Sequence, residues 1–276
     1  MNAITGRNRG RPKAFHDKSQ DVIIQSLDRA IDVLKTVASG SGMTLTRIAE
    51  TGGQSAATCY RILTTLNKHR IVEFDETSQL WYIGLEGFRI GMNFVGRTRI
   101  AEQSRPVMQR IMSETGETAN LAILDRGEVT FISQVETHEP IRAFFRPGTR
   151  GPGHASGIGK AIMAFLPEDQ ARTSLPEDLP RYTANTITTR ESFMDELAAI
   201  RARGFAIDNE ERTEGMRCIA APVFNAYGEA IAGVSLSGPS VRVKPGRDAE
   251  FGALIKHAAD EITRATGGIV KSPSGG

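Results

Sequence analysis

The stretch LTRIAETGGQSAATCYRILTTLNKH, residues 45–69, decides the fold of the first third of the chain. Apolar residues recur at three- and four-residue steps on both sides of Gly52-Gly53, which predicts one helix over 45–51 and a second over 55–69. Glycine tolerates the positive backbone angle that a tight corner between two helices often needs. The stretch therefore predicts a helix-turn-helix.

The outward face of the second predicted helix combines short hydroxyl side chains with one tyrosine, one arginine and no carboxylate. Its residues are Ala57, Thr58, Tyr60, Arg61, Thr64 and Thr65. Such a face can enter the major groove of DNA, because small and cationic groups fit there and a carboxylate would repel phosphate. We expect these residues, together with Ser55, to contact DNA. A small helical domain that contacts only other proteins is the alternative.

The flanking segments complete a winged helix-turn-helix over residues 23–84. A periodic apolar face over 24–38 predicts a preceding helix. The strand-like runs 71–74 and 80–83 bracket a turn and predict a β-hairpin. This hairpin is the wing, which we expect to contact phosphate or the minor groove of DNA.

Helical periodicity continues after the hairpin, with breaks expected near Gly96 and Pro106. It predicts a linker helix over 85–100, followed by the first helix of a second domain, residues 101–270. Within that domain, strand-like and helical segments are mixed. The expected strands are 119–124, 129–135, 141–145, 205–208, 218–224 and 230–237, and the expected helices begin near Ser156, Arg190 and Arg247. The fold class is therefore α+β, an antiparallel sheet with packed helices. We expect Phe144, Phe145, Met163 and Phe165 in its core and not at a ligand site.

The first 22 residues form a basic arm that we expect to be disordered in isolation. Residues 1–100 hold 14 Lys and Arg against 9 Asp and Glu, whereas the rest of the chain holds 20 against 23. Within the arm, Arg9 and Arg11 belong to a Gly-Arg-Pro strip that resembles an AT-hook, a motif that lies in the minor groove. A solvated tail with only nonspecific phosphate attraction is the alternative.

The composition narrows the class of protein. The chain has 276 residues with 39% apolar side chains, and no apolar run approaches the roughly 20 residues of a membrane helix. Two cysteines are too few for a disulfide framework, so we expect a reducing cytoplasm and no membrane association. The sequence has no phosphate-binding loop, dinucleotide fingerprint or metal-ligand spacing. We therefore expect no catalytic residue, cofactor or metal.

The chain resembles the IclR-type (isocitrate lyase regulator) transcription factors from about Gln25 to Thr266. The resemblance rests on separate strings that occur in the same order. In the first part they are 25–30 (QSLDRA), 45–50 (LTRIAE), 58–66 (TCYRILTTL) and 81–84 (WYIG). In the second part they are 154–161 (HASGIGKA), 208–211 (DNEE), 215–223 (GMRCIAAPV) and 238–239 (GP). Two departures are Ser55-Ala56-Ala57, where the family commonly has Pro-Lys-Ser, and Tyr60, where it often has histidine. The operator sequence of relatives is therefore not transferable.

The resemblance implies a DNA-binding transcriptional regulator that is a homodimer or homotetramer on a palindromic operator. Its second domain would be GAF-like and would bind a small effector. In relatives that sense glyoxylate, the positions that match Asp208, Cys218, Ser235 and Ser237 hold the ligand. We therefore favour glyoxylate as the effector, with pyruvate or another small acid next.

The residues themselves support an anion site. Strand alternation puts Ser235 and Ser237 on one face. A helix that begins near Ser156 would offer the amides of Ser156, Gly157 and Ile158 to an anion.

Purely structural roles are the alternative for the same residues. Cys218 can be an ordinary buried strand residue, the two serines can bond to neighbouring backbone, and Asp208 can cap a turn. A different class of function is a cysteine-dependent hydrolase with Cys218 as nucleophile and His154 as base. No acylation motif surrounds Cys218, and such an enzyme would leave the helix-turn-helix unexplained. A structural nucleoid protein would not need the second domain.

Overall fold

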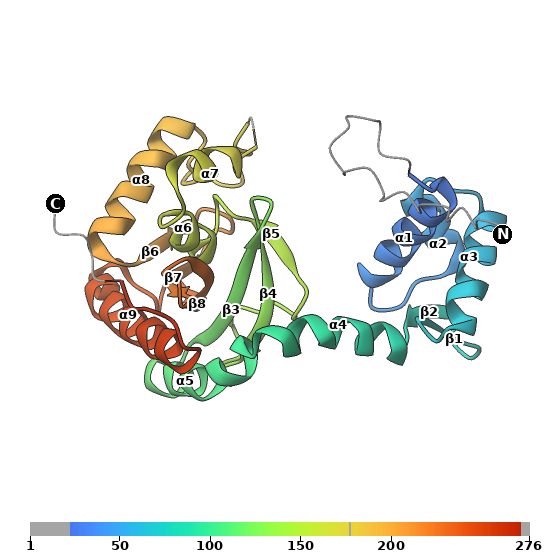
Figure 1. Cartoon of the computed structure of the whole chain (residues 1–276), viewed down its shortest axis with the longest axis horizontal. Helices are drawn as coiled ribbons and strands as arrows, with labels where there is room; N and C mark the ends of the chain where they lie inside the picture. The colour runs from blue at the N-terminus through green and yellow to red at the C-terminus, as the bar shows by residue number, and fades with distance from the viewer. Residues whose placement is uncertain (1–22, 177, 272–276) are drawn as a thin grey trace, which may run out of the picture. The chain divides into compact units, whose positions relative to one another are not determined.

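The computed structural model describes residues 23–176 and 178–271. The basic arm, with Arg9 and Arg11, lies outside the described residues, so its expected disorder and its minor-groove contact stay predictions. The chain divides into two compact units, Met1–Asn93 and Phe94–Gly276 (Figure 1). None of the described helices is both long and apolar enough to cross a membrane.

The first unit is a winged helix-turn-helix, as the sequence predicts. It consists of α1 (Gln25–Ala38), α2 (Leu45–Gly52), α3 (Ala56–Lys68), β1 (Val72–Asp75), β2 (Leu80–Ile83) and the beginning of α4 (Leu85–Thr98). The two strands pair in an antiparallel hairpin. The core beneath them is formed by Val33, Val37, Ile48, Cys59, Leu63 and Trp81, all buried.

Local chemistry fixes the corner between α2 and α3. Gly53 ends α2 with φ 61°, a left-handed conformation that suits glycine. The hydroxyl of Ser55 then accepts a hydrogen bond from the amide of Thr58 and caps α3. The turn and the cap together set the direction in which α3 leaves the corner.

The second unit contains a six-stranded antiparallel sheet in the order β5-β4-β3-β8-β7-β6. Its strands are β3 (Thr118–Asp125), β4 (Glu128–Val135), β5 (Arg150–Pro152), β6 (Ala206–Asn209), β7 (Met216–Phe224) and β8 (Ala230–Pro239). Its helices are α5 (Ile100–Thr115), α6 (Gly157–Met163), α7 (Glu168–Thr173), α8 (Arg190–Arg203), the short 3₁₀ helix η1 (Pro245–Arg247) and α9 (Asp248–Ala265). The predicted α+β class is confirmed.

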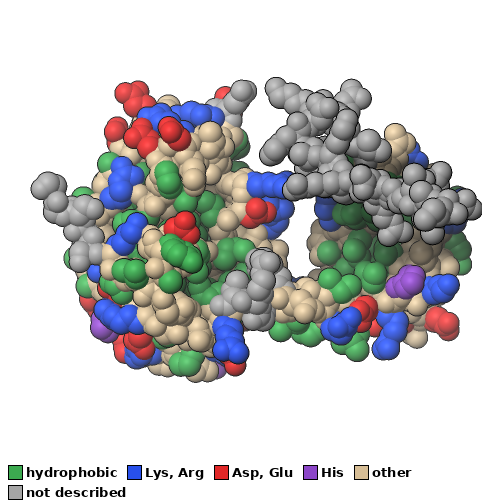
Figure 2. Space-filling view, viewed as in Figure 1, with side chains coloured by type: hydrophobic (Ala, Val, Ile, Leu, Met, Phe, Trp, Pro, Cys, Tyr) green, Lys and Arg blue, Asp and Glu red, His purple; other side chains and the backbone are tan. Residues whose placement is uncertain are grey.

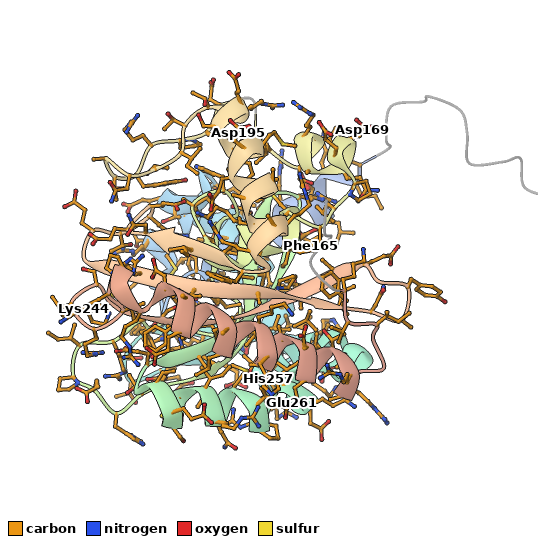
Figure 3. The ribbon with its side chains drawn as sticks, turned by 90° about the vertical axis from the view of Figure 1, so that its left-hand side faces the viewer. Phe165, Asp169, Asp195, Lys244, His257 and Glu261 are labelled. Carbon is orange, nitrogen blue, oxygen red and sulfur yellow. The ribbon has the colours of Figure 1, made fainter. Side chains whose placement is uncertain are left out.

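The sheet lies between two helical layers (Figures 1 and 3). On one face, α5 and α9 cover apolar residues of β3, β7 and β8. Helices α6, α7 and α8 cover the opposite face. In Figure 3, His257 and Glu261 mark α9, and Asp195 marks α8 on the other side of the sheet. Because β7 and β8 are covered on both faces, they read as nearly continuous apolar runs.

Two details of the predicted elements are wrong. Residues 141–145 do not form a strand, because Phe145 folds back to stack on Phe131, and β5 pairs with β4 in its place. No break occurs at Pro106, which lies inside α5 with its ring exposed to solvent. The helical path is interrupted at Arg99, where φ is 50°, close to the other break, which was expected near Gly96.

Candidate functional site

The strand register groups the polar side chains that the sequence singled out. Asp208 on β6 lies opposite Cys218 on β7, which lies opposite Ser237 on β8. Directly opposed residues share a face of the sheet. Ser235, two residues before Ser237, lies on that face as well. A carboxyl, a thiol and two hydroxyls from three strands therefore form one polar patch, and α6 packs over β7 and β8.

The patch forms one wall of a cavity, and the first turn of α6 forms another. All seven predicted effector residues line the cavity: Ser156, Gly157, Ile158, Asp208, Cys218, Ser235 and Ser237. Helix α6 sits so close that a Cβ on Gly157 would lie 2.9 Å from the Cys218 Sγ. The free space amounts to about 70 Å³.

Further residues line the cavity that the sequence did not single out. They are Val129, Phe131, Ala143, Phe145, Ala155, Arg212, Thr213, Met216 and Arg217. The rings of Phe131 and Phe145 stack with their centroids 4.4 Å apart. The expectation of a core position is wrong for Phe144, which is 50% exposed, whereas Phe145 packs against the core cluster and also lines the cavity. The alternation of Ala143 and Phe145 is the sequence signal for this wall, although by itself it predicts a strand.

Burial raises the pKa values of the two ionisable groups of the polar patch. Desolvation, with the nearby charge of Glu211, raises the pKa of Asp208 to about 7, although Lys160 and Arg212 oppose the shift. Desolvation also raises the pKa of the Cys218 thiol to about 11. A thiol with such a pKa stays neutral near pH 7 and is a poor nucleophile.

His154 also departs from the role that a hydrolase would require. Its Nε2 lies 3.0 Å from the carbonyl oxygen of Pro180, and burial lowers its pKa. The ring therefore holds the loop before α6, as a residue that orders this segment would. The raised pKa of the Cys218 thiol leaves the pair without a ready nucleophile near pH 7.

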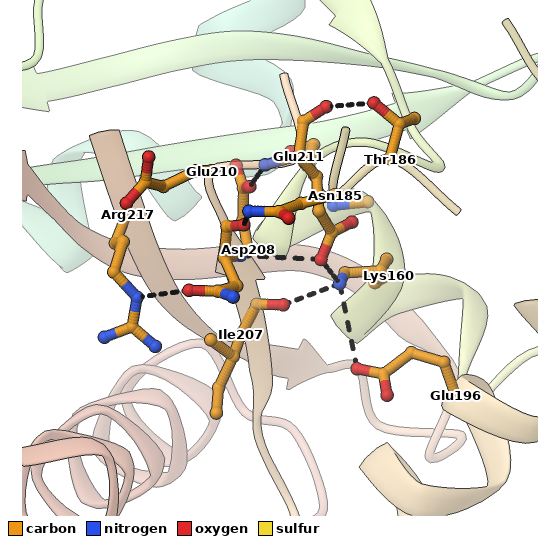
Figure 4. Close-up of polar contacts among 12 residues, drawn as sticks. Lys160, Asn185, Thr186, Glu196, Ile207, Asp208, Glu210, Glu211 and Arg217 are labelled. Atoms are coloured by element: carbon orange, nitrogen blue, oxygen red, sulfur yellow. Dashed lines mark hydrogen bonds and ion pairs between the residues drawn. The ribbon is translucent and has the colours of Figure 1, made fainter. Parts of the chain in front are cut away.

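A buried charge cluster lies beside the cavity (Figure 4). Lys160 of α6 is 1% exposed and pairs with Glu211, while its Nζ donates to the carbonyl of Ile207 at 2.6 Å. Glu196 of α8 approaches the same ammonium at 3.7 Å. The amide of Glu211 donates to Asp208 Oδ1 at 2.8 Å. The cluster thus ties α6 and α8 to the segment that follows β6, part of which lines the cavity.

The outward face of α3 in the first unit has the character that the sequence predicts. Ala57, Tyr60, Arg61, Thr64 and Thr65 are exposed. The hydroxyls of Ser55 and Thr58 lie 2.9 Å apart at the beginning of α3, where Ser55 acts as the helix cap. The hydroxyl of Thr65 donates to the carbonyl of Arg61. Arg61 and Tyr60 therefore remain the long polar side chains that this face can extend toward a base.

The turn of the wing carries acidic side chains, which repel phosphate. It contains Asp75 and Glu76, and Asp75 accepts hydrogen bonds from the amides of Thr77 and Ser78. These bonds lower the pKa of Asp75 and keep it charged.

On the visible face of the second unit, acidic and basic side chains are interspersed (Figure 2). The face of α3 is therefore the candidate for DNA contact that the described residues favour.

Comparison with known proteins gives consistent matches along the chain. A model described as the IclR helix-turn-helix domain matches residues 26–76, and one described as the bacterial transcriptional regulator IclR C-terminal matches residues 92–264. The HTH-type transcriptional regulator BhcR of Paracoccus denitrificans is 46% identical over 94% of this chain and 92% of its own length. The acetate operon repressor of Salmonella typhimurium is 33% identical over 97% of this chain and 99% of its own. Among solved structures, IclR of Thermotoga maritima superposes with a TM-score of 0.72 at 30% identity, covering 89% of this chain and 100% of that one.

Proposed function

This chain belongs to the IclR family of DNA-binding transcriptional regulators, and from that premise we propose that its effector is a very small oxo acid, glyoxylate in the first place. The observation that carries the proposal is the cavity wall. One side chain carboxyl, one thiol and two hydroxyls face the first amides of α6 across it. The first amides of a helix have no acceptor inside the helix, so they are available to an anion.

The size of the cavity favours a ligand of few atoms. One water needs at least about 10–15 Å³ of such space. The 70 Å³ of this cavity therefore suits a molecule with a handful of heavy atoms better than an aromatic acid. The name of the acetate operon repressor, a full-length relative, points to two-carbon metabolism as well.

The polar patch can recognise both ends of an oxo acid. Hydroxyls donate to a carboxylate, and a protonated Asp208 can donate to a carboxylate or a carbonyl oxygen. Pyruvate is the second candidate, because the apolar wall around Phe131 and Phe145 could accept its methyl group. The neutral Cys218 thiol adds a weak donor without adding charge.

We propose that the DNA contacts are made by Ser55, Ala57, Thr58, Tyr60, Arg61, Thr64 and Thr65. The protein would act in the cytoplasm as a homodimer or homotetramer on a palindromic operator. Effector binding would shift the population between arrangements that differ in operator affinity. The effector domain is proposed to be of the GAF-like type.

Calorimetric titration tests the effector directly. The protein is titrated with glyoxylate, pyruvate, acetate and two aromatic acids at fixed pH and salt. Saturable micromolar binding of glyoxylate, with weaker or absent binding of the aromatic acids, is expected. Binding of an aromatic acid alone, or of none of these acids, would contradict the proposed effector.

Removal of both serine hydroxyls should weaken effector binding strongly. The Ser235→Ala/Ser237→Ala variant loses two donors, and a hydrogen bond to a charged group contributes about 1.5–3 kcal/mol. We expect glyoxylate affinity to fall by roughly 100-fold or more by calorimetry. Operator affinity without effector should stay unchanged, and unaltered glyoxylate affinity would place the binding site elsewhere.

Effector affinity should depend on pH through Asp208, whose pKa is raised to about 7. A bound anion favours the protonated form of the Asp208 carboxyl. When the pH is above the pKa of Asp208, the protein must therefore take up a proton as the anion binds. We therefore expect affinity to be constant at low pH and to fall by up to about tenfold per pH unit as pH rises above 7. In Asp208→Asn, which keeps the shape but cannot ionise, the affinity should be level between pH 6 and 8. An identical pH profile in both proteins would assign the effect to another group.

A further inference from the structure

Asn120 is a fully buried amide in the middle of the sheet. It lies on β3, where it is opposed by Ser235 of β8 on one side and Gln134 of β4 on the other. Its neighbours in the strand, Ala119 and Leu121, are apolar and pack toward α5 and α9. Burying an amide is costly unless its hydrogen bonds are made. The partners of Asn120 therefore indicate why this strand carries a polar side chain.

The partners form a chain that ends at the cavity. Gln134 Nε2 donates to Asn120 Oδ1 at 2.8 Å, and Asn120 Nδ2 donates to Ser237 Oγ at 3.1 Å. Ser237 lines the cavity, whereas neither Asn120 nor Gln134 belongs to the described lining residues. Asn120 thus reaches the cavity only through the hydroxyl of Ser237.

The direction of these bonds determines what Ser237 can offer. A serine hydroxyl has one hydrogen to donate and two lone pairs to accept with. Because Asn120 donates to Ser237 Oγ, one lone pair is occupied and the hydroxyl hydrogen must point to another acceptor. Ser235 Oγ lies at 3.5 Å and the Cys218 sulfur is a further hydrogen-bond partner of Ser237, but an anion in the cavity would be a better acceptor than either the hydroxyl or the neutral thiol.

We propose that Asn120 is a positioning residue for the effector site, which directs the Ser237 hydroxyl as a donor into the cavity. Gln134 fixes the orientation of the Asn120 amide by donating to its oxygen, so that the nitrogen faces Ser237. This relay, the hydrogen-bond chain from Gln134 through Asn120 to Ser237, favours a ligand with hydrogen-bond acceptors, such as a carboxylate. This inference rests on the proposed function, since it concerns the same cavity and the same class of effector.

The test is a double-mutant cycle between Asn120 and Ser237, read by calorimetry with sodium glyoxylate. Asn120→Leu keeps the branched shape of the side chain and removes its donor. We expect it to weaken glyoxylate binding by about 5- to 20-fold in the unaltered background and by less than about twofold in the Ser237→Ala background. A residue that acts through Ser237 loses its effect once that hydroxyl is gone.

Thr118→Val is the matched control. Thr118 is also fully buried on β3, and its Oγ1 accepts from the amide of Thr137. We expect this variant to keep the glyoxylate affinity of the unaltered protein, which would exclude a general loosening of β3.

A second variant, Asn120→Asp, replaces the donor by an acceptor that competes for the Ser237 hydrogen. It should weaken binding more than Asn120→Leu does.

The outcomes separate the two ideas. Equal loss from Asn120→Leu in both backgrounds would overturn the relay and leave a structural role for Asn120. Unchanged affinity in Asn120→Leu would overturn it as well, while the proposed effector would stand. Absence of glyoxylate and pyruvate binding by the unaltered protein would overturn the proposed effector, and this inference with it.

Discussion

Arg61→Ala is expected to bind operator DNA about 100-fold more weakly than the unaltered protein. Arg61 is exposed on the outward face of α3, and an arginine that reads a base edge contributes about 1–3 kcal/mol. A symmetric dimer would lose that contribution in each half-site, which multiplies the two effects. A duplex is first selected from a random pool by the unaltered protein. Affinity is then measured by fluorescence anisotropy at several salt concentrations.

Lys35→Ala provides the control for loss of positive charge in the same unit. Lys35 lies on α1, exposed, with Asp32 at 3.5 Å. Its removal should change operator affinity by less than about threefold, since one exposed charge makes a modest contribution. Glyoxylate affinity should be unchanged in both variants. Equal weakening by Lys35→Ala and Arg61→Ala would mean that α3 has no special part in recognition.

Lys160→Met is expected to lower the free energy of unfolding of the second unit by about 3–5 kcal/mol. Lys160 and Glu211 are both buried, and removal of one partner leaves an uncompensated charge. Burial already raises the pKa of Glu211, and loss of the ammonium would raise it further. A raised carboxyl pKa makes the folded state less stable as pH rises, so the loss should be larger at pH 8 than at pH 6. Differential scanning calorimetry at both pH values measures it.

Two further variants sharpen this measurement. Lys256→Met removes a lysine from α9 that is 30% exposed and pairs with Asp260 at 3.0 Å, and it should cost less than about 1 kcal/mol. Glu211→Leu added to Lys160→Met should restore most of the lost stability, because it removes the carboxyl that Lys160 had paired with. A loss in Lys160→Met no greater than in Lys256→Met would show that the buried pair contributes little.

The local sequence pattern was sufficient to predict most of the helices and strands. The outward face of α3, the corner at Gly53 and the hairpin follow from residues that are neighbours in sequence, where period and turn chemistry act directly. The two errors in the elements arose where a distant contact outweighed the local pattern. Phe145 stacks on Phe131 instead of extending a strand, and an exposed Pro106 is tolerated inside α5.

The sequence by itself determined the winged helix-turn-helix, the α+β class and the shared face of Ser235 and Ser237, because each depends on periodicity within one segment. Only the tertiary structure decided which distant groups meet. Ser237 and Asn120 are 117 positions apart, and Lys160 and Glu211 are 51 apart. Such pairs depend on the register between strands and on helix packing, which no local pattern encodes. The same packing removes water from Asp208 and so raises its pKa to about 7, a property that the tertiary environment confers on an ordinary aspartate.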